Sequence, residues 1–283
     1  MPKFSSILSS ILNSTHPVPS FSVALFTLMF SFGIELPAMK IALVSLAVLM
    51  QQFSVGLSND WLDYSRDLSS KRKDKPVALG EVPPSLIKNL SILAGLVALL
   101  LSSALGILNV LCMLLMLLVG WGYNLGLKAN WLSFLPYAIG FGILPVFVTV
   151  SLPASQLPPL WLVIAAALLG VSAHFSNVLP DILEDIETGV YSLPHILGQR
   201  ISAVIIFSCA VGASAIVVSQ TPQMNQLFTT IVLLATILFS GTASFLALRK
   251  QPPRIVFTLL LVTAFTNVIL LVAALGETEL VSL

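Results

Sequence analysis

Charged side chains are scarce in this sequence. Asp, Glu, Lys and Arg together make up 9% of the 283 residues, while hydrophobic residues make up 57%. About a quarter of the residues in a typical soluble domain are charged. The composition therefore predicts a polytopic membrane protein, and a formal net charge of +1 gives no reason to expect nucleic-acid binding.

Cysteine is nearly absent as well. Cys112 and Cys209 are the only two, and both fall inside apolar runs. We expect two small buried side chains there, which argues against a disulfide or a cysteine metal site.

The N-terminus lacks the pattern of a signal peptide. It carries one basic residue, Lys3, and no small-residue cleavage site follows a compact apolar core. Apolar residues recur instead at helical spacing from Phe4 to Leu12, which predicts a short helix in the membrane interface within residues 1–17. We expect Pro17 to end it before the first span.

Long apolar runs are what the sequence has in abundance. Nine of them can cross about 30 Å of hydrocarbon. We therefore expect an all-α fold, a bundle of nine transmembrane helices that forms one domain over residues 1–283. The runs cover approximately residues 20–38, 41–59, 87–106, 108–126, 131–151, 159–179, 201–219, 227–248 and 255–275.

The basic residues predict the orientation of these spans. If the N-terminus is cytoplasmic, twelve of the thirteen Lys and Arg residues fall on the inner side, and only Lys40 falls outside. Cytoplasmic loops carry such an excess of basic residues. The same topology places nine of the twelve carboxylates in the inner segments that follow spans 2 and 6.

These two inner segments share one spacing. Residues 59–80 and 177–198 both read Asn-x3-Asp-x3-Asp and then Pro-x2-Leu-Gly, at a constant offset of 118 residues. Residues four apart share one face of an α-helix, where like charges repel, so each row indicates a cation between its carboxylates. The rows are Asn59, Asp63 and Asp67, and Asn177, Asp181 and Asp185.

Two facing rows of this kind suit a magnesium–diphosphate site. Oxygen ligands could hold one or two Mg²⁺ ions against a diphosphate, which would neutralise a leaving group. The basic run Lys71, Arg72, Lys73 and Lys75 could contact further phosphate oxygens and also set the orientation. A diphosphate at the rim of an apolar bundle implies a long apolar tail, such as a polyprenyl chain, in the bilayer.

In these motifs the chain resembles the UbiA-type intramembrane prenyltransferases. Their first signature, Asn-Asp-x2-Asp-x3-Asp, stands here complete as Asn59, Asp60, Asp63 and Asp67, and their second resembles the row from Asn177 to Asp185. The resemblance extends over nearly the whole chain. It implies that both rows bind Mg²⁺ and the prenyl diphosphate, with Asp60 in support.

The resemblance extends to the inner end of span 4. There the family has a Tyr/Lys pair that serves the diphosphate or the cation, and Tyr123 and Lys128 occupy that place. They are five residues apart where the family usually shows four, and Asn124 has the four-residue spacing to Lys128. The second motif also departs from the family, at Val178 and Pro180.

We therefore expect a Mg²⁺-dependent enzyme that transfers a polyprenyl group to an aromatic or other small lipophilic acceptor, with its active-site cavity on the cytoplasmic side. No residue selects among the acceptors that the resemblance allows. The predicted metal ligands are Asn59, Asp63, Asp67, Asp181 and Asp185. The predicted substrate-binding residues are Asn59, Asp60, Arg72, Lys73, Lys75, Tyr123, Asn124 and Asn177, and the predicted catalytic residues are Asp63, Asp67, Asp181, Asp185 and Lys128.

Other functions fit the sequence less well. A transporter built from parallel repeats would show polar residues and broken helices near mid-span, which this sequence does not. A CDP-alcohol transferase would need an Asp-Gly and Ala-Arg signature that is absent. A UbiA fold with altered catalysis is the remaining alternative, because of Pro180. Among the histidines, His174 is predicted to be a hydrogen-bonded residue between helices, and His195 to face water.

Overall fold

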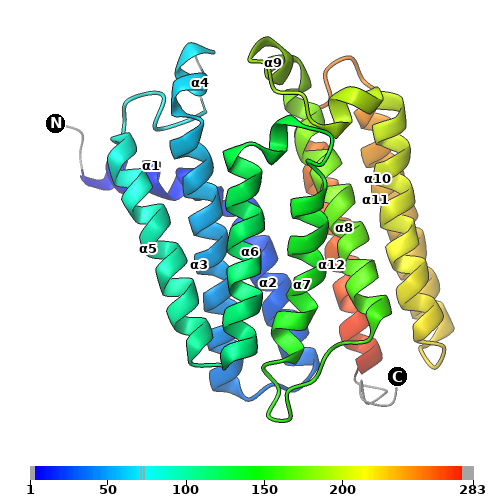
Figure 1. Ribbon diagram of the computed structural model, residues 1–283. Helices are drawn as coiled ribbons and strands as arrows, with labels where there is room; N and C mark the ends of the chain where they lie inside the picture. The colour runs from blue at the N-terminus through cyan, green and yellow to red at the C-terminus, as the bar shows by residue number, and fades with distance from the viewer. Residues whose placement is uncertain (1–3, 71, 73, 276–283) are drawn as a thin grey trace.

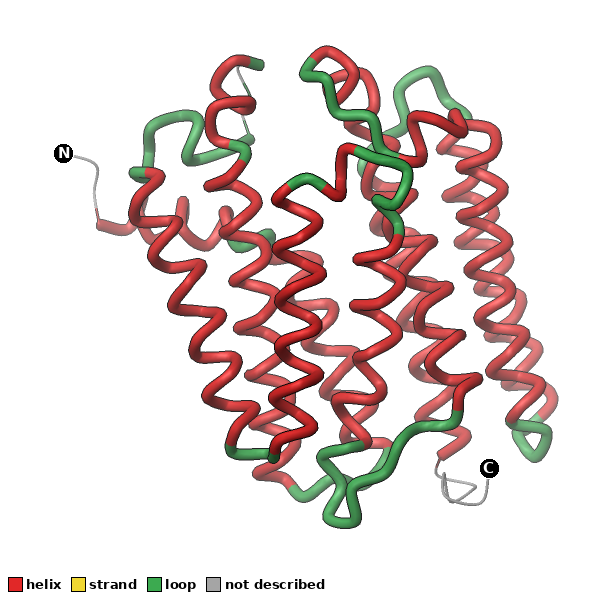
Figure 2. Tube along the Cα trace, in the orientation of Figure 1, coloured by secondary structure: helices red, strands yellow, loops and turns green. Residues whose placement is uncertain are grey.

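The chain folds as a bundle of roughly parallel helices (Figures 1 and 2). The structure, a computed structural model, describes residues 4–70, 72 and 74–275, and within these ranges it contains no strand. The helices are α1 (Phe4–Ser14), α2 (Pro17–Gly33), α3 (Ala38–Leu62), α4 (Tyr64–Ser69), α5 (Pro84–Ser103), α6 (Ile107–Leu125), η1 (Leu127–Ala129), α7 (Leu135–Thr149), α8 (Leu160–Val178), η2 (Leu179–Asp181), α9 (Ile182–Glu187), α10 (Leu193–Gln220), α11 (Gln226–Ala247) and α12 (Ile255–Leu275).

Each of the nine predicted spans coincides with one helix of the bundle. Seven of these helices are long and apolar enough to cross a membrane, so the chain is an integral membrane protein. The other two, α2 and α7, have 17 and 15 residues, and at 1.5 Å per residue α7 extends only about 23 Å. The all-α fold is confirmed, whereas the count of nine transmembrane helices stays a prediction.

Short elements gather at one end of the bundle. Helices α4 and α9 both lie at the upper end in Figure 1, next to the start of α12. The connections at the opposite end, such as those from α5 to α6 and from α10 to α11, carry no further helix. Both acidic segments therefore lie at the same end, as their separation by four spans predicts.

Small residues let the helices approach closely around this end. A Cβ added at Gly170 of α8 would lie 2.4 Å from the Tyr137 carbonyl oxygen of α7, and one at Gly120 of α6 would lie 2.5 Å from Val55 of α3. Contacts of this kind pack helices in a bilayer, where the hydrophobic effect does not drive one helix against another. They join α3 to α6 and α7 to α8, and α3, α6 and α8 carry the predicted site residues Asn59, Asp60, Tyr123, Asn124 and Asn177.

The predicted N-terminal helix is present as α1. Its Ile7 and Ile11 pack against a buried cluster that includes Leu57 of α3, while Leu8 and Leu12 are exposed. The two apolar faces suit a helix held between protein and lipid, although its place in the membrane interface stays a prediction. The free thiol of Cys112 is buried and that of Cys209 half-buried.

Candidate functional site

A cavity of about 680 Å³ opens at the end of the bundle that carries α4 and α9. It lies among α2, α3, α6, α7, α8 and α12, and both acidic rows line it. Lys73 lies outside the described residues; every other predicted site residue contributes to the lining. These are Asn59, Asp60, Asp63, Asp67, Arg72, Lys75, Tyr123, Asn124, Lys128, Asn177, Asp181 and Asp185.

The side chains of the first row keep their helical spacing although the helix is interrupted at Asp63. Helix α3 ends at Leu62 and α4 begins at Tyr64, with Asp63 between them at φ −84° and ψ −2°. Hydrogen bonds at four-residue spacing nevertheless continue, because the Asp63 N–H donates to the Asn59 carbonyl at 2.9 Å and the Asp67 N–H to the Asp63 carbonyl at 2.8 Å. The three side chains therefore keep one face, as predicted.

Asp63 is the best-compensated carboxylate of this row. The Lys128 ammonium donates to its Oδ2 at 2.6 Å, the Arg66 guanidinium at 2.8 Å and the Asn59 amide at 3.0 Å. The Asp63 side chain is 8% exposed. Burial lowers the pKa of Lys128, and the contact with Asp63 acts in the opposite direction. Opposite charges at this distance stabilise each other.

Asp67 has no comparable partner. It is buried, and its nearest cation among the described residues is the Arg66 Nε at 3.8 Å, beyond hydrogen-bond distance. Burial raises the pKa of Asp67, and the neighbouring Asp63 carboxylate adds to the shift. A buried carboxylate that lacks a hydrogen-bonded cation is a suitable ligand for a metal ion.

Asp60 and Asn124 hold the site together. Asp60 accepts from the Lys75 ammonium at 2.5 Å and lies 3.0 Å from the His16 Nε2 atom. The Asn124 amide of α6 donates to the Val55 carbonyl and the Ser58 hydroxyl of α3, at 2.9 and 2.8 Å, while its oxygen accepts from the Asn59 amide at 3.3 Å. Its bonds join α6 to α3 beside the first row.

The second row does not lie on one continuous helix, so that expectation is wrong. Helix α8 ends at Val178, the 3-10 turn η2 spans Leu179–Asp181, and α9 begins at Ile182. The cause is Pro180, which has no N–H to donate to the preceding turn and whose ring crowds the backbone. Asp181 and Asp185 still face the cavity that Asp63 lines.

Ion pairs join the second row to distant parts of the chain. Arg72, in the loop after α4, donates to Glu184 of α9 at 2.8 Å and lies 3.9 Å from Asp181. Arg254, just before α12, lies 3.6 Å from Asp181 and donates to Asp74 at 2.9 Å. Arg72 also holds the pKa of Asp74 well below its usual range by hydrogen bonding. The mouth of the cavity is therefore crossed by charged contacts.

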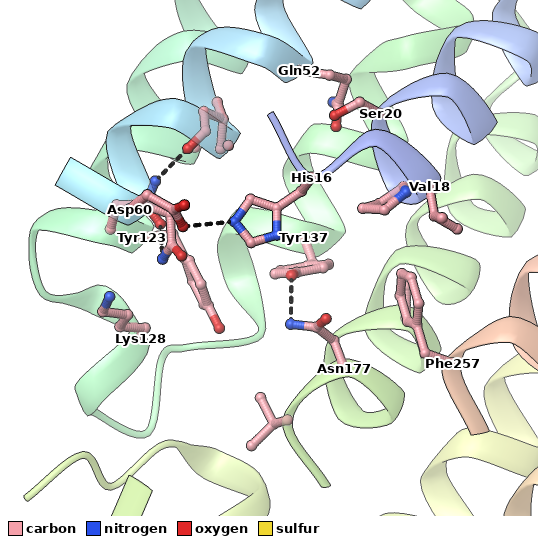
Figure 3. A pocket seen from close by; sticks show the side chains of 18 of the residues that line it. His16, Val18, Ser20, Gln52, Asp60, Tyr123, Lys128, Tyr137, Asn177 and Phe257 are labelled. Carbon is pink, nitrogen blue, oxygen red and sulfur yellow. Dashed lines mark hydrogen bonds and ion pairs between the residues drawn. The ribbon is translucent and has the colours of Figure 1, made fainter. Parts of the chain in front are cut away.

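Aromatic side chains form the wall between the rows. Tyr123 and Tyr137 both line the cavity, with ring centroids 5.3 Å apart in an edge-to-face arrangement, and the Asn177 amide donates to the Tyr137 hydroxyl at 3.3 Å (Figure 3). His174 packs against both tyrosines. Its Nε2 lies 3.0 Å from the Ser133 hydroxyl in a buried position, which confirms the prediction for this histidine.

The prediction that His195 faces water is wrong. Its side chain is 1% exposed, and it forms a capping box with Ser192 at the start of α10. Its Nδ1 lies 2.7 Å from the Ser192 hydroxyl and accepts from the Ser192 N–H at 3.2 Å. The imidazole is thus a helix cap, and its Nε2 lies 3.8 Å from Asp185.

Several lining residues were not predicted. Arg66 stands inside the first motif, where the sequence marks it only as an inner basic charge. Tyr137, Gln52 and Arg254 carry no motif that would select them. His16 gave one usable signal, a polar residue directly before Pro17 at the start of the first span.

The donor set fits Mg²⁺ shared with a substrate better than a closed protein site. Among the described residues, no three His, Cys, Asp or Glu side chains are grouped closely enough to hold a metal ion. Mg²⁺ characteristically takes one or two protein carboxylates and completes its shell with water and phosphate oxygens. Asp67, buried without a hydrogen-bonded cation, is the residue that most needs such an ion.

Comparisons with known proteins agree with this architecture. The model of the UbiA prenyltransferase family matches residues 20–269. A UbiA homologue from Archaeoglobus fulgidus, solved bound to DMAPP and Mg²⁺, is 15% identical with a TM-score of 0.71, over 95% of this chain and 100% of that chain. An apo UbiA homologue from Aeropyrum pernix K1 is 19% identical with a TM-score of 0.71, over 88% and 94%.

A third solved structure is described as a study of digeranylgeranylglyceryl phosphate synthase in membranes. It is 16% identical with a TM-score of 0.67, over 95% of this chain and 99% of that chain. At such identities the likeness establishes the fold. No curated protein matches the chain.

Proposed function

This chain belongs to the UbiA prenyltransferase family, and we propose that it transfers a polyprenyl group from its diphosphate to a small lipophilic acceptor in a Mg²⁺-dependent reaction. One observation carries the proposal. Two acidic rows, 118 residues apart in the sequence, line one cavity that also has aromatic and apolar lining residues. The homologue solved with DMAPP and Mg²⁺ supports the choice of donor and metal.

The diphosphate and the prenyl tail of the donor contact different kinds of residue. The diphosphate would lie between the rows, where Asp67 on one side and Asp181 or Asp185 on the other could hold Mg²⁺ shared with its oxygens. A metal ion there would neutralise the diphosphate as a leaving group. Arg72 and Lys75, with 12% and 11% of their side chains exposed, add fixed positive charge beside the first row. The prenyl tail lies along apolar residues such as Met116, Leu144 and Leu261.

In the reaction the bond between C1 of the prenyl group and the diphosphate oxygen breaks, and its electron pair leaves with the diphosphate. The allylic cation that remains is stabilised by the faces of Tyr123 and Tyr137, because an aromatic ring has a negative face. The apolar wall excludes the water that would otherwise quench the cation. The acceptor then forms a bond to C1 and gives up one proton.

The proposal includes the topology predicted from the basic residues. The cavity opens toward the cytoplasm, together with the N-terminus, and residues 1–283 act as one catalytic domain. The opposite end of the bundle carries Lys40, whose ammonium donates to the Ser151 carbonyl at 2.6 Å. The twelve remaining Lys and Arg residues belong to the N-terminal segment or to the connections at the cavity end under this topology.

Two isosteric variants test the proposal. Asp63→Asn and Asp181→Asn keep the volume of each side chain and remove its charge, one in each row. In purified full-length protein in nanodiscs, we expect Mg²⁺-dependent release of diphosphate from geranyl diphosphate to fall at least 100-fold in both. Lys40→Gln, at the far end of the bundle, is the matched control and should retain the rate. Full activity in either Asn variant would overturn the proposal.

A further inference from the structure

The backbone at His16 is in an unfavourable conformation. Its φ of 51° and ψ of 65° lie in the left-handed region, which residues other than glycine rarely adopt. A proline follows, and the residue before a proline is normally held in an extended conformation. A strained residue of this kind persists only where the surrounding structure enforces it, which points to a role for its side chain.

Helix α3 fixes one edge of the His16 imidazole. A Cβ added at Gly56 would lie 2.6 Å from the Thr15 carbonyl oxygen and 3.3 Å from the His16 Cδ2 atom, so only glycine lets this turn approach so closely. One turn further along α3, the Asp60 Oδ1 lies 3.0 Å from Nε2. The Cδ2–Nε2 edge of the ring therefore rests on α3.

The opposite edge of the ring, which carries Nδ1, is turned to the cavity. His16 is among the lining residues, and 37% of its side chain is exposed. Figure 3 shows the imidazole between Asp60 and the middle of the pocket, with Tyr137 and Asn177 on its far side. No hydrogen bond to Nδ1 exists among the described residues, whereas Nε2 contacts Asp60 and, at 3.3 Å, the Lys75 ammonium.

A second hydrogen-bonding group lies on the same side of the cavity. Gln52 of α3 lines it near Ser20 of α2 (Figure 3), and its amide nitrogen donates to the Gln51 oxygen at 2.8 Å. This leaves the Gln52 carbonyl oxygen as an acceptor. Together with Val18 and Val23, these groups form one wall of the cavity, which offers two acceptor atoms and adjoins the Asp60–Lys75 pair beside the first row.

We propose that this wall is the acceptor subsite, and that it takes a lipophilic molecule with a hydroxyl group, a phenol or an alcohol, whose O–H donates to His16 Nδ1. The inference rests on the proposed function and narrows its acceptor to one chemical class. A hydroxyl donor suits the wall because both of its unused groups are acceptors. An apolar body suits Val18 and Val23.

His16 then acts as the base of the transfer step. Asp60 accepts from Nε2–H, which places the ring proton on Nε2 and the lone pair on Nδ1. After the C1–O bond has broken and its electron pair has left with the diphosphate, the acceptor forms its bond to C1 of the prenyl cation. As this bond forms, the hydroxyl proton of the acceptor moves to Nδ1. Asp60 stabilises the resulting imidazolium. The Lys75 ammonium donates to the same carboxylate at 2.5 Å.

Matched probes and two variants test the inference. The donor is radiolabelled geranyl diphosphate, and the probe acceptors are 1,4-dihydroxynaphthalene, 4-hydroxybenzoate and dodecanol, each paired with its methyl ether. His16→Gly and His16→Asn both tolerate a positive φ, so neither should disturb the turn. Donor binding, diphosphate release and product formation are measured separately on full-length protein in nanodiscs, with Lys40→Gln as the control.

We expect at least one hydroxyl probe to be prenylated and its ether not. Both variants should bind the donor within twofold of the wild type and lose at least 100-fold in product formation. Added imidazole should restore part of this loss in His16→Gly, where it fills the vacated space, but not in His16→Asn.

Other outcomes overturn the inference. The first is that a methyl ether is prenylated as fast as its hydroxyl probe. The second is that either His16 variant forms product at the wild-type rate. The third is that a variant loses donor binding as well as product formation. Diphosphate release without prenylation of any hydroxyl probe would do so as well. If the wild type fails even to release diphosphate with Mg²⁺, the proposed function itself fails, and this is a separate result.

Discussion

Replacing Lys128 with Met tests how charge is balanced in the cavity. Methionine keeps the length and the apolar stem of the side chain and removes only the ammonium group. In the wild type this ammonium lies 2.6 Å from Asp63 Oδ2, with 12% of the Lys128 side chain and 8% of the Asp63 side chain exposed. The substitution therefore leaves a buried carboxylate with Arg66 as its remaining cation.

The expected loss in the free energy of unfolding depends on Arg66, which still pairs with Asp63. A hydrogen bond between charged groups contributes about 1.5–3 kcal/mol. We expect the lower end, about 1.5 kcal/mol, because Arg66 still donates to Asp63 at 2.8 Å and because burial penalises the ammonium, as its lowered pKa shows. For a chain of this size the loss corresponds to roughly 3–6 °C in the midpoint of thermal unfolding.

The assay is thermal unfolding in nanodiscs without donor, combined with a double-mutant cycle. Asp63→Asn paired with Lys128→Met removes both charges of this pair, and Arg66 keeps Asp67, at 3.8 Å, as a neighbouring carboxylate. The double variant should then be about 1 kcal/mol more stable than the sum of the single losses predicts. Strictly additive losses, or a Lys128→Met variant as stable as the wild type, would refute the idea that Asp63 depends on the Lys128 ammonium for its charge.

Three further predictions follow from the same geometry. Because burial raises the pKa of Asp67 in the metal-free protein, Mg²⁺ binding should weaken on acidification at a higher pH than an ordinary aspartate, whose pKa is about 3.9, would give; this weakening, measured as Mg²⁺ affinity against pH, should be absent in Asp67→Asn, and its persistence there would contradict the prediction. Gly170→Ala places a Cβ 2.4 Å from the Tyr137 carbonyl, so calorimetry should show a loss of about 1–3 kcal/mol; unchanged stability would contradict the tight contact. Chelation with EDTA should abolish diphosphate release, and added Mg²⁺ should restore it, whereas release that persists in EDTA would exclude the metal.

Local patterns let the sequence predict the fold and the acidic rows. Apolar length located each helix of the bundle, and the four-residue spacing placed Asn59, Asp63 and Asp67 on one face. The same rule was wrong for the second row, because Pro180 replaces part of the helix with a 3-10 turn. Spacing assumes a continuous helix, and one residue that cannot donate its N–H is enough to break it.

The residues that could not be predicted reach the cavity from elsewhere in the chain. Arg254 pairs with Asp74 across 180 residues, and His16 meets Asp60 across 44. Such pairs depend on how the helices are arranged, which no local spacing encodes. His195 shows the same limit, since a loop position suggested water while the actual partner, Ser192, caps a helix.

The ion pairs also bear on the order in which the protein assembles during synthesis. Asp60 and Asp63 find their partners in His16, Lys75, Arg66 and Lys128, all within the first half of the chain. Asp181 and Glu184 instead depend on Arg72, made long before them, and Asp181 also on Arg254, made last. As the ribosome delivers the spans, the early half can settle in the lipid with Asp60 and Asp63 already paired. Asp181 and Glu184 in the second half reach Arg72 only after that half has packed against the first.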